Sequence, residues 1–275
     1  MIRHRTAEIA AVLWVAASAA GSAADLRDAT VAAFDRYVRL TEVRMDAEMR
    51  GGRPFLWLDS LTESRRTDAS AALLRGETVV SRLETRDGGK TIDVPDGLLH
   101  HWVGTVFAPG VRLEQVVRLM QSYERYPDIY RPAIRRSRTL SHEGDRFNVQ
   151  LRLFMKKVIS VVLDTDNDVR YIDAGPNRKQ VRSYATRIAE IDDAGTPRER
   201  EKPVGHDNGF LWRFNNYCSI EERAEGSYVQ CESVSLSRRI PTGLGWLIGP
   251  FVTSIPRESL EFTLGTIRRT VTKGA

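Results

Sequence analysis

Two adjacent histidines, His100 and His101, lie beside Trp102 in an apolar run of the chain. Because successive side chains of a strand point to opposite faces, only one of these histidines can face the inside of a sheet. An imidazole in that position can polarise a bound ligand or act as a general base. The alternative is a structural or exposed histidine pair, so the sequence assigns no catalytic residue.

Two cysteines, Cys218 and Cys231, flank a predicted turn at Ala224–Gly226. The strand-like runs Phe210–Glu222 and Tyr228–Ser237 on either side of the turn predict a hairpin. Both cysteines lie equally far from its centre, which places them opposite each other and within reach of a disulfide. We therefore predict a disulfide. Two free buried thiols are the alternative, because a one-residue shift of register would separate the pair.

Three carboxylates, Asp164, Asp166 and Asp168, alternate with other residues near a predicted bend. The glycine and the terminal glutamate of a calcium-binding loop are missing around them, which favours a solvated loop. The two cysteines have no histidines nearby and so do not match a zinc-binding pattern. The sequence also lacks a nucleophile elbow and a phosphate-binding glycine loop. We expect neither a metal nor a cofactor.

The elements that would position these groups follow one another in a simple order. Leu98–Phe107 is predicted to be a strand, and Val111–Ser122 and Tyr123–Arg131 are predicted to be two short helices. Phe147–Met155 alternates apolar and polar residues, the clearest strand signal of the chain. The other predicted strands are Ile134–Leu140, Val158–Leu163 with Val169–Ile172 beyond a bend, Lys179–Ile191 and the two strands of the cysteine hairpin.

The chain ends with an apolar periodic segment, Ser259–Val271, which predicts an amphipathic helix. Ser254 is the expected cap of this helix, and Pro256 suits its first turn. A long polar loop, Asp192–Asn208, lies before the cysteine hairpin.

A further segment, residues 25–97, precedes the first strand of this series. Leu26–Met49 and Leu58–Arg75 have helical patterns. Thr78–Glu84 and Lys90–Val94 flank Asp87-Gly88-Gly89, which predicts a hairpin. We interpret residues 25–97 as a helical lead-in and a hairpin that pack on a main domain of residues 98–275.

The N-terminus has the features of a secretory signal peptide over residues 1–24. Arg3 and Arg5 precede the apolar stretch Ile9–Ala20, and small residues follow from Gly21 to Ala24. The stretch is short for a bilayer span, although a retained anchor is the alternative. We expect a periplasmic or secreted protein.

Composition and charge limit the classes of partner. Hydrophobic residues make up 41% of the 275 residues, and 41 basic residues oppose 36 acidic ones, giving a net charge of +5. Nucleic-acid surfaces concentrate such charge in a stripe, whereas here the excess is thin and spread along the chain. The densest cluster is Arg131, Arg135, Arg136 and Arg138. We expect no nucleic acid and allow a transient contact with anionic lipid headgroups.

The order β-α-α-β(n)-α, with Tyr126-Pro127 in the second short helix and Ser137–Leu140 opening the strand run, resembles the START-like (SRPBCC) superfamily. This superfamily includes polyketide cyclase and coenzyme-Q-binding relatives. The resemblance covers Leu98–Val271. It implies an α+β helix-grip fold, a curved antiparallel sheet around a long C-terminal helix, with a hydrophobic tunnel between them. The N-terminal helical extension and the loop Asp192–Asn208 lie outside the usual pattern.

Aromatic and aliphatic residues of these elements are the candidates to line such a tunnel. Aromatic walls with a few polar groups suit a flat or long apolar molecule, although at strand and helix spacing such residues are also ordinary core. The candidates are His101, Trp102, Tyr126, Tyr130, Leu151, Leu153, Trp212, Phe214, Trp246 and Phe251.

Together these features predict an exported binding protein that holds a lipid or another hydrophobic small molecule in an internal tunnel. One alternative is a cyclase- or hydrolase-like enzyme that uses an inward His100 or His101 as a base. The other is an envelope interaction protein whose N-terminal segment docks a partner.

Overall fold

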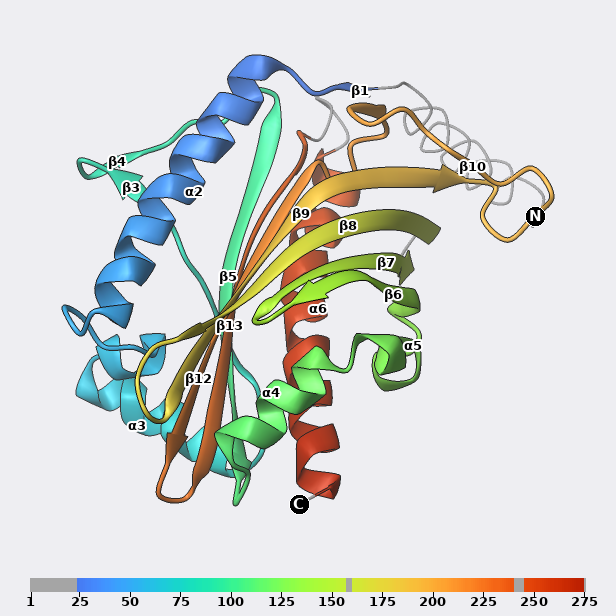
Figure 1. Cartoon of the computed structure of the whole chain (residues 1–275). Helices are drawn as coiled ribbons and strands as arrows, with labels where there is room; N and C mark the ends of the chain where they lie inside the picture. The colour runs from blue at the N-terminus through green and yellow to red at the C-terminus, as the bar shows by residue number, and fades with distance from the viewer. Residues whose placement is uncertain (1–23, 157–159, 240–244, 275) are drawn as a thin grey trace, which may run out of the picture.

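The computed structural model describes residues 24–156, 160–239 and 245–274. Its main feature is a nine-stranded antiparallel sheet in which β2, β5, β13, β12, β9, β8, β7 and β6 are neighbours in that order and β10 pairs with β9 (Figure 1). The strands are β2 Val79–Arg82, β5 Gly97–Pro109, β6 Ile134–Glu143, β7 Arg146–Lys156, β8 Ser160–Asp173, β9 Arg178–Asp192, β10 Arg200–Glu201, β12 Arg213–Arg223 and β13 Gly226–Arg238.

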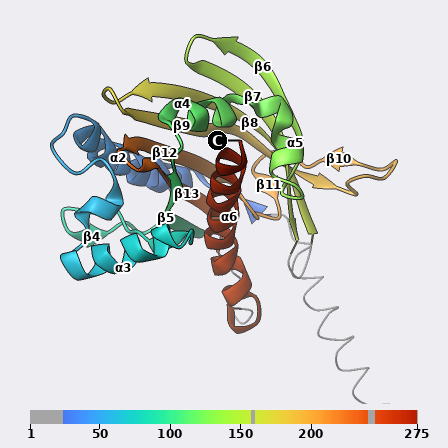
Figure 2. The same cartoon turned by 90° about the horizontal axis from the view of Figure 1, so that it is seen from below.

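Helices lie on both sides of this sheet. The sheet curves around the long helix α6, and α2 lies on the opposite side of the sheet (Figure 2). The helices are α2 Asp28–Met49, α3 Glu63–Leu74, α4 Leu113–Gln121, α5 Tyr126–Ile129 and α6 Gly245–Lys273, with 3-10 turns at Trp57–Ser60 and Tyr123–Arg125. Two short pairs complete the fold, β1 Ala24–Asp25 with β11 His206–Asp207 and β3 Arg86–Asp87 with β4 Lys90–Thr91. This arrangement confirms the predicted α+β helix-grip fold with an N-terminal helical extension.

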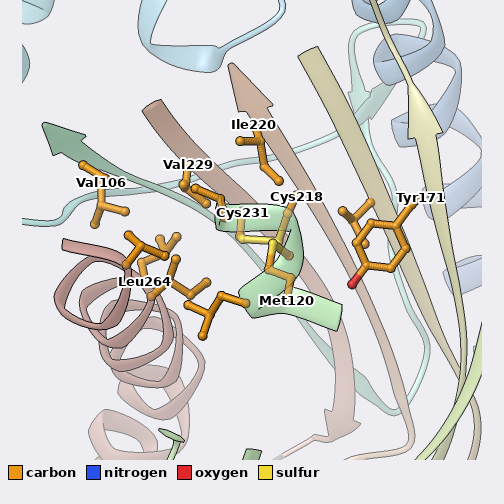
Figure 3. Packing of buried hydrophobic residues seen from close by; sticks show 14 of the residues in the cluster. Val106, Met120, Tyr171, Cys218, Ile220, Val229, Cys231 and Leu264 are labelled. Atoms are coloured by element: carbon orange, nitrogen blue, oxygen red, sulfur yellow. A yellow bond between two sulfur atoms is a disulfide. The ribbon is translucent and has the colours of Figure 1, made fainter. Parts of the chain in front are cut away.

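Strand alternation gives the sheet two buried faces, which we call the interior face, toward α6, and the outer face, toward α2. On the interior face, Val106, Ile220 and Val229 pack with Leu264 of α6 in the main hydrophobic cluster (Figure 3). On the outer face, Leu236 and its neighbours pack against α2 in a second cluster. A sheet covered on both faces leaves both sets of alternating residues buried.

The cysteine hairpin forms as predicted. Cys218 lies directly opposite Cys231 in the β12–β13 register, and the two are joined in a disulfide. Both cysteines are buried on the interior face, inside the main cluster (Figure 3). The bond therefore ties together two neighbouring strands of the wall that α6 packs against.

The predicted hairpin between Thr78–Glu84 and Lys90–Val94 is wrong. Val79–Arg82 instead pairs with β5 at the edge of the main sheet, and only Arg86–Asp87 and Lys90–Thr91 form a hairpin. Pairing with β5 places Val80 against the interior cluster, whereas a separate hairpin would leave it without an apolar partner.

Two further boundaries differ from expectation. Helix α6 begins at Gly245, so Ser254 and Pro256 lie within it rather than at its start. The bend expected at Asp164–Asp168 is absent, because β8 is continuous from Ser160 to Asp173. The local irregularity belongs to β9, whose register shifts opposite Asp166 and Asn167.

Candidate functional site

The interior face has an apolar half that is filled by side chains. Leu260, Leu264 and Ile267 of α6 pack there with α4 and with an aromatic group from α5 and the strands. Gly104 of β5 lies so close to α6 that a Cβ at this position would come within 2.7 Å of Leu264 Cδ1. These contacts hold α6 against the sheet. The other half of the interior face is lined by polar side chains and by half-buried apolar ones.

The predicted ligand contacts Tyr126 and Tyr130 belong to the aromatic group of the apolar half. Their ring centroids lie 4.8 Å apart, and the Tyr126 hydroxyl donates a hydrogen bond to the Met120 carbonyl at 2.6 Å. The hydroxyls of Tyr123 and Tyr171 are 2.9 Å apart beside them. Burial raises the pKa of the Tyr126 hydroxyl, which keeps it neutral. Tyr126 and Tyr130 are therefore packed in the main hydrophobic cluster, and the hydroxyls of Tyr123, Tyr126 and Tyr171 have hydrogen-bond partners.

The second half of the interior face carries a set of uncharged polar side chains that we call the interior polar patch. In one cross-strand row, Asn216 of β12 lies between Ser183 of β9 and Ser233 of β13. In the next row, Ser235 of β13 lies opposite His100 of β5. The patch consists of His100, Ser183, Asn216, Ser233, Ser235 and Ser237.

His100 is the titratable member of this patch. Its Nε2 lies 3.1 Å from the Ser237 hydroxyl oxygen. Burial, with a smaller contribution from the positive charge of Arg82, lowers the pKa of His100 to about 4. The imidazole is therefore neutral near pH 7, where it can donate one hydrogen bond and accept another.

His100 should make the stability of the protein depend on pH. An unfolded histidine takes up a proton near pH 6.5, whereas the folded one resists protonation until about pH 4. The stabilising contribution is therefore complete above pH 6.5 and is lost as the pH falls toward 4, a loss of about 3 kcal/mol. Urea unfolding at pH 7.5 and pH 4.5 should show a larger loss for the wild type than for His100→Gln.

The comparison with His100→Gln removes the contribution of other groups. Burial raises the pKa values of Glu190 and Asp207, so these carboxyls favour the fold at lower pH, with the opposite sign. The wild type and His100→Gln both contain these two carboxyls, so their contribution cancels when the stability losses of the two proteins are compared. Equal losses of unfolding free energy in wild type and variant would show that His100 is not responsible.

Apolar side chains surround the interior polar patch without being fully buried. Trp102 lies beside Ser233 in the sheet, and Phe214 lies on the other side of Ser235 from His100. Leu151 and Leu153 of β7 lie on the same interior face. All four side chains are only half-buried, unlike their counterparts in the apolar half. The polar patch and this apolar border form the candidate site.

His101 and Trp212 do not face the interior, contrary to prediction. His101 lies on the outer face, where its ring contacts Tyr37 of α2. Trp212 packs in the outer cluster and donates a hydrogen bond from Nε1 to Asp207 Oδ1 at 3.0 Å. Both residues are buried on the outer face because α2 covers it: Tyr37 of α2 contacts His101, and apolar residues of α2 belong to the cluster that contains Trp212.

The remaining two candidates, Trp246 and Phe251, lie in the first turns of α6. Their side chains are outside the described part of the structure. Residues 1–23, which include almost all of the predicted signal peptide, are outside it as well.

The aspartates near the predicted bend are partners of arginines. Asp164 accepts two hydrogen bonds from Arg152, at 2.7 and 2.6 Å, and Asp168 pairs with Arg146 and Arg170. No group of three or more His, Cys, Asp or Glu residues within the described ranges is arranged to hold a metal ion. These carboxylates serve as ion-pair partners along the strands.

Two surface hollows lie away from the candidate site. One, of about 660 Å³, lies between α2 and the β3–β4 turn and is lined by Arg36, Asp87 and Lys90 among others. The other, of about 600 Å³, lies beside α3 and is lined by Leu74, Arg223 and Tyr228 among others. Both mix charged with apolar groups and are open to solvent. Among the described helices, none has the length and apolar character needed to cross a bilayer.

Sequence reasoning missed the interior polar patch, although a signal for it exists. Residues 233–237 read Ser-Val-Ser-Leu-Ser, a strict alternation. The apolar pair Val234 and Leu236 would ordinarily be placed inside, with the serines in solvent. Here Val234 and Leu236 pack under α2, and the serines face the interior.

Comparison with known proteins gives similarity at the level of the fold. No protein-family model matches the chain, and no curated protein matches it. A STAR-related lipid transfer protein from Xanthomonas axonopodis is 16% identical over 70% of this chain and 98% of that chain, with a TM-score of 0.43. Human STARD10 is 10% identical over 76% and 81% of the two chains, with a TM-score of 0.43. The Zhui aromatase/cyclase from Streptomyces is 12% identical over 64% and 94%, with a TM-score of 0.38. The element order and the sheet curved around the long C-terminal helix α6 are those of a helix-grip fold.

Proposed function

We propose that the protein binds a lipid or another hydrophobic small molecule between the interior face and α6. The observation that carries this proposal is the half-buried state of Trp102, Leu151, Leu153 and Phe214 on the face of the sheet that curves around α6 (Figure 2). Apolar side chains that face a helix but keep part of their surface uncovered gain when an apolar molecule covers them, at roughly 25 cal/mol per Å². Binding of this kind needs no reaction and no cofactor.

The N-terminal sequence supports export as part of the same proposal. Residues 1–24 have the basic start, apolar stretch and small residues of a signal peptide. A periplasmic or secreted carrier of apolar molecules would collect and deliver its cargo at membranes. Transient contact with anionic headgroups through exposed arginines is compatible with the net charge of +5.

The enzymatic alternative is less well supported. His101 is hydrogen-bonded beneath α2, which leaves His100 as the interior histidine. With a pKa of about 4, His100 is a weak general base at neutral pH. Its geometry suits hydrogen bonding to a ligand better than removal of a proton.

Native mass spectrometry of the purified protein, followed by organic extraction, tests the proposal. We expect a stoichiometric bound lipid or isoprenoid, or its uptake from a membrane extract. Leu153→Arg, which places a charge among the interior apolar residues, should abolish binding, whereas Leu140→Arg at an exposed position should not. A clean apo mass with no uptake from the extract would refute the proposal.

A further inference from the structure

Arg82 places a positive charge at one edge of the interior face. It is the last residue of β2, the edge strand of the sheet, and lies opposite Trp102 in the register with β5. Val80, two residues earlier on the same strand, packs against the interior cluster, so the Arg82 side chain leaves β2 on the same side. After burial, the charge of Arg82 is the second cause of the lowered pKa of His100, so this charge acts on the interior polar patch.

Arg82 has no ion-pair partner among the residues that the structure describes. Glu84 feels its charge, but this carboxylate accepts hydrogen bonds from Arg86 and Thr91, at 2.6 and 2.8 Å. Glu261 of α6 is paired with an arginine of its own helix at 2.9 Å. The exposed guanidinium of Arg82 is therefore free to pair with an anion that comes from outside the chain.

Arg82 also begins a cross-strand row that runs over five strands of the interior face. The row continues through Trp102 of β5, Ser233 of β13, Asn216 of β12 and Ser183 of β9. Neighbouring strands lie about 4.8 Å apart, so the row leads from an exposed cation over an aromatic side chain into the interior polar patch. Within this row, Arg82 is the residue that carries a formal charge.

This order of groups suits an amphiphile with one negative charge. The planar guanidinium can hydrogen-bond two oxygens of a carboxylate or of a phosphodiester at once. Because Arg82 is exposed, an oxyanion bound there keeps part of its hydration, which reduces the cost of desolvating its charge. The adjoining hydrocarbon covers the half-buried Trp102 and Phe214, which gain from contact with an apolar chain.

We infer that the molecule held on the interior face carries a singly charged oxyanion, a carboxylate or a phosphodiester, that pairs with Arg82. This inference rests on the proposed binding function and names the chemical class of its ligand. The charged group lies at the β2 edge, and the hydrocarbon extends over Trp102 toward the middle of the sheet. A molecule with the same hydrocarbon and no net charge lacks the ion pair and binds more weakly.

Two matched pairs of fluorescent probes test the inference on the full chain at pH 8. cis-Parinaric acid and its methyl ester test for a carboxylate, and pyrene-labelled phosphatidylglycerol and phosphatidylcholine with the same chains test for a phosphodiester. In at least one pair we expect the anion to bind about fivefold more tightly than its partner without net charge, and that pair identifies the oxyanion. The preference should shrink in about 1 M salt, where the Debye length is about 3 Å.

Arg82→Gln tests the assigned residue. We expect it to weaken binding of the anion about fivefold and to leave binding of the uncharged probe unchanged, so that the preference disappears. Arg82→Lys keeps the charge but not the planar fork and should retain part of the preference. Because Arg82 is exposed, both variants should fold with an unchanged melting temperature. Arg39→Gln, which removes an exposed arginine of α2 on the opposite side of the sheet, is the matched control and should retain the preference.

The outcomes separate the inference from the function on which it rests. If the uncharged probe of both pairs binds the wild type as tightly as the anion, the inference is wrong and the binding function stands. If the preference survives in Arg82→Gln, or if Arg39→Gln abolishes it equally, the assignment to Arg82 is wrong. If no probe binds, the ligand extracted for mass spectrometry decides. An anionic ligand supports the inference, an uncharged one contradicts it, and the absence of any ligand refutes the proposed function together with it.

Discussion

Replacing Glu232 with alanine is expected to lower the free energy of unfolding by about 3–5 kcal/mol, since removal of one partner leaves buried polar groups uncompensated. Glu232 lies on the outer face of β13, with its side chain 3% exposed. Its Oε1 is 2.6 Å from His101 Nε2 and also pairs with Arg44 of α2. Urea unfolding at neutral pH measures the change.

The hydrogen bonds around His101 show why this loss should be large. The Tyr37 hydroxyl accepts a hydrogen bond from the Thr85 amide at 2.7 Å and so donates its proton to His101 Nδ1, also at 2.7 Å. His101 Nε2–H then donates to Glu232. Burial by itself would raise the pKa of Glu232, but the hydrogen bond from His101 and the hydrogen bond and positive charge of Arg44 lower it. The Glu232 carboxylate is therefore the ionised end of a chain of hydrogen bonds, through His101 and Tyr37, that joins the sheet to α2.

An ion-paired glutamate at the surface provides the control. Glu77 pairs with Arg75 at 2.6 Å, but both side chains are more than half exposed. Glu77→Ala should leave stability almost unchanged, because exposed ion pairs contribute little. If Glu232→Ala lowered the free energy of unfolding as little as Glu77→Ala, the hydrogen bonds from Glu232 through His101 to Tyr37 would not be what holds α2 on the sheet.

Replacing Leu264 with alanine is expected to lower the free energy of unfolding by about 3–5 kcal/mol through loss of buried apolar contact and creation of a cavity. Leu264 is 0% exposed and lies against Gly104, where the absence of a side chain lets α6 approach β5 closely. The resulting cavity would lie in the apolar half that fixes α6. Denaturant unfolding measures the loss.

Leu74 at the end of α3 is the matched control, because it undergoes the same substitution while 69% exposed. Leu74→Ala should change the unfolding free energy by less than about 0.5 kcal/mol. Comparable losses at the two positions would mean that the packing of α6 against β5 is not a main source of stability.

The role of α2 separates two interpretations of the N-terminal segment. Phe34, Tyr37, Val38 and Met45 of α2 are buried against the outer face of the chain's own sheet. This apolar surface is therefore already covered within the molecule. An interaction protein that docks a partner through the N-terminal segment would need its exposed side, which carries Val43 at 62% exposure.

Local patterns were enough to predict most of the elements. Alternation over residues 147–155 identified β7, because a strand with one apolar face repeats every two residues. Equal distances from the turn identified the Cys218–Cys231 pair, because an antiparallel hairpin has a definite register. The hairpin after α3 was mispredicted because turn residues show where a chain reverses and not which strand the next segment joins.

The sequence by itself predicted the order of most strands and helices and the cysteine pairing, and its resemblance to a known superfamily implied the helix-grip arrangement. Only the tertiary structure decided which side of each strand faces inward. Val234 and Leu236 look like interior residues by their hydrophobicity, yet α2 covers the outer face and provides a second core for them. The serines between them, with His100, are turned toward α6. Periodicity reports that two faces differ, but the choice between them depends on what each face packs against, and that partner lies far away in the sequence.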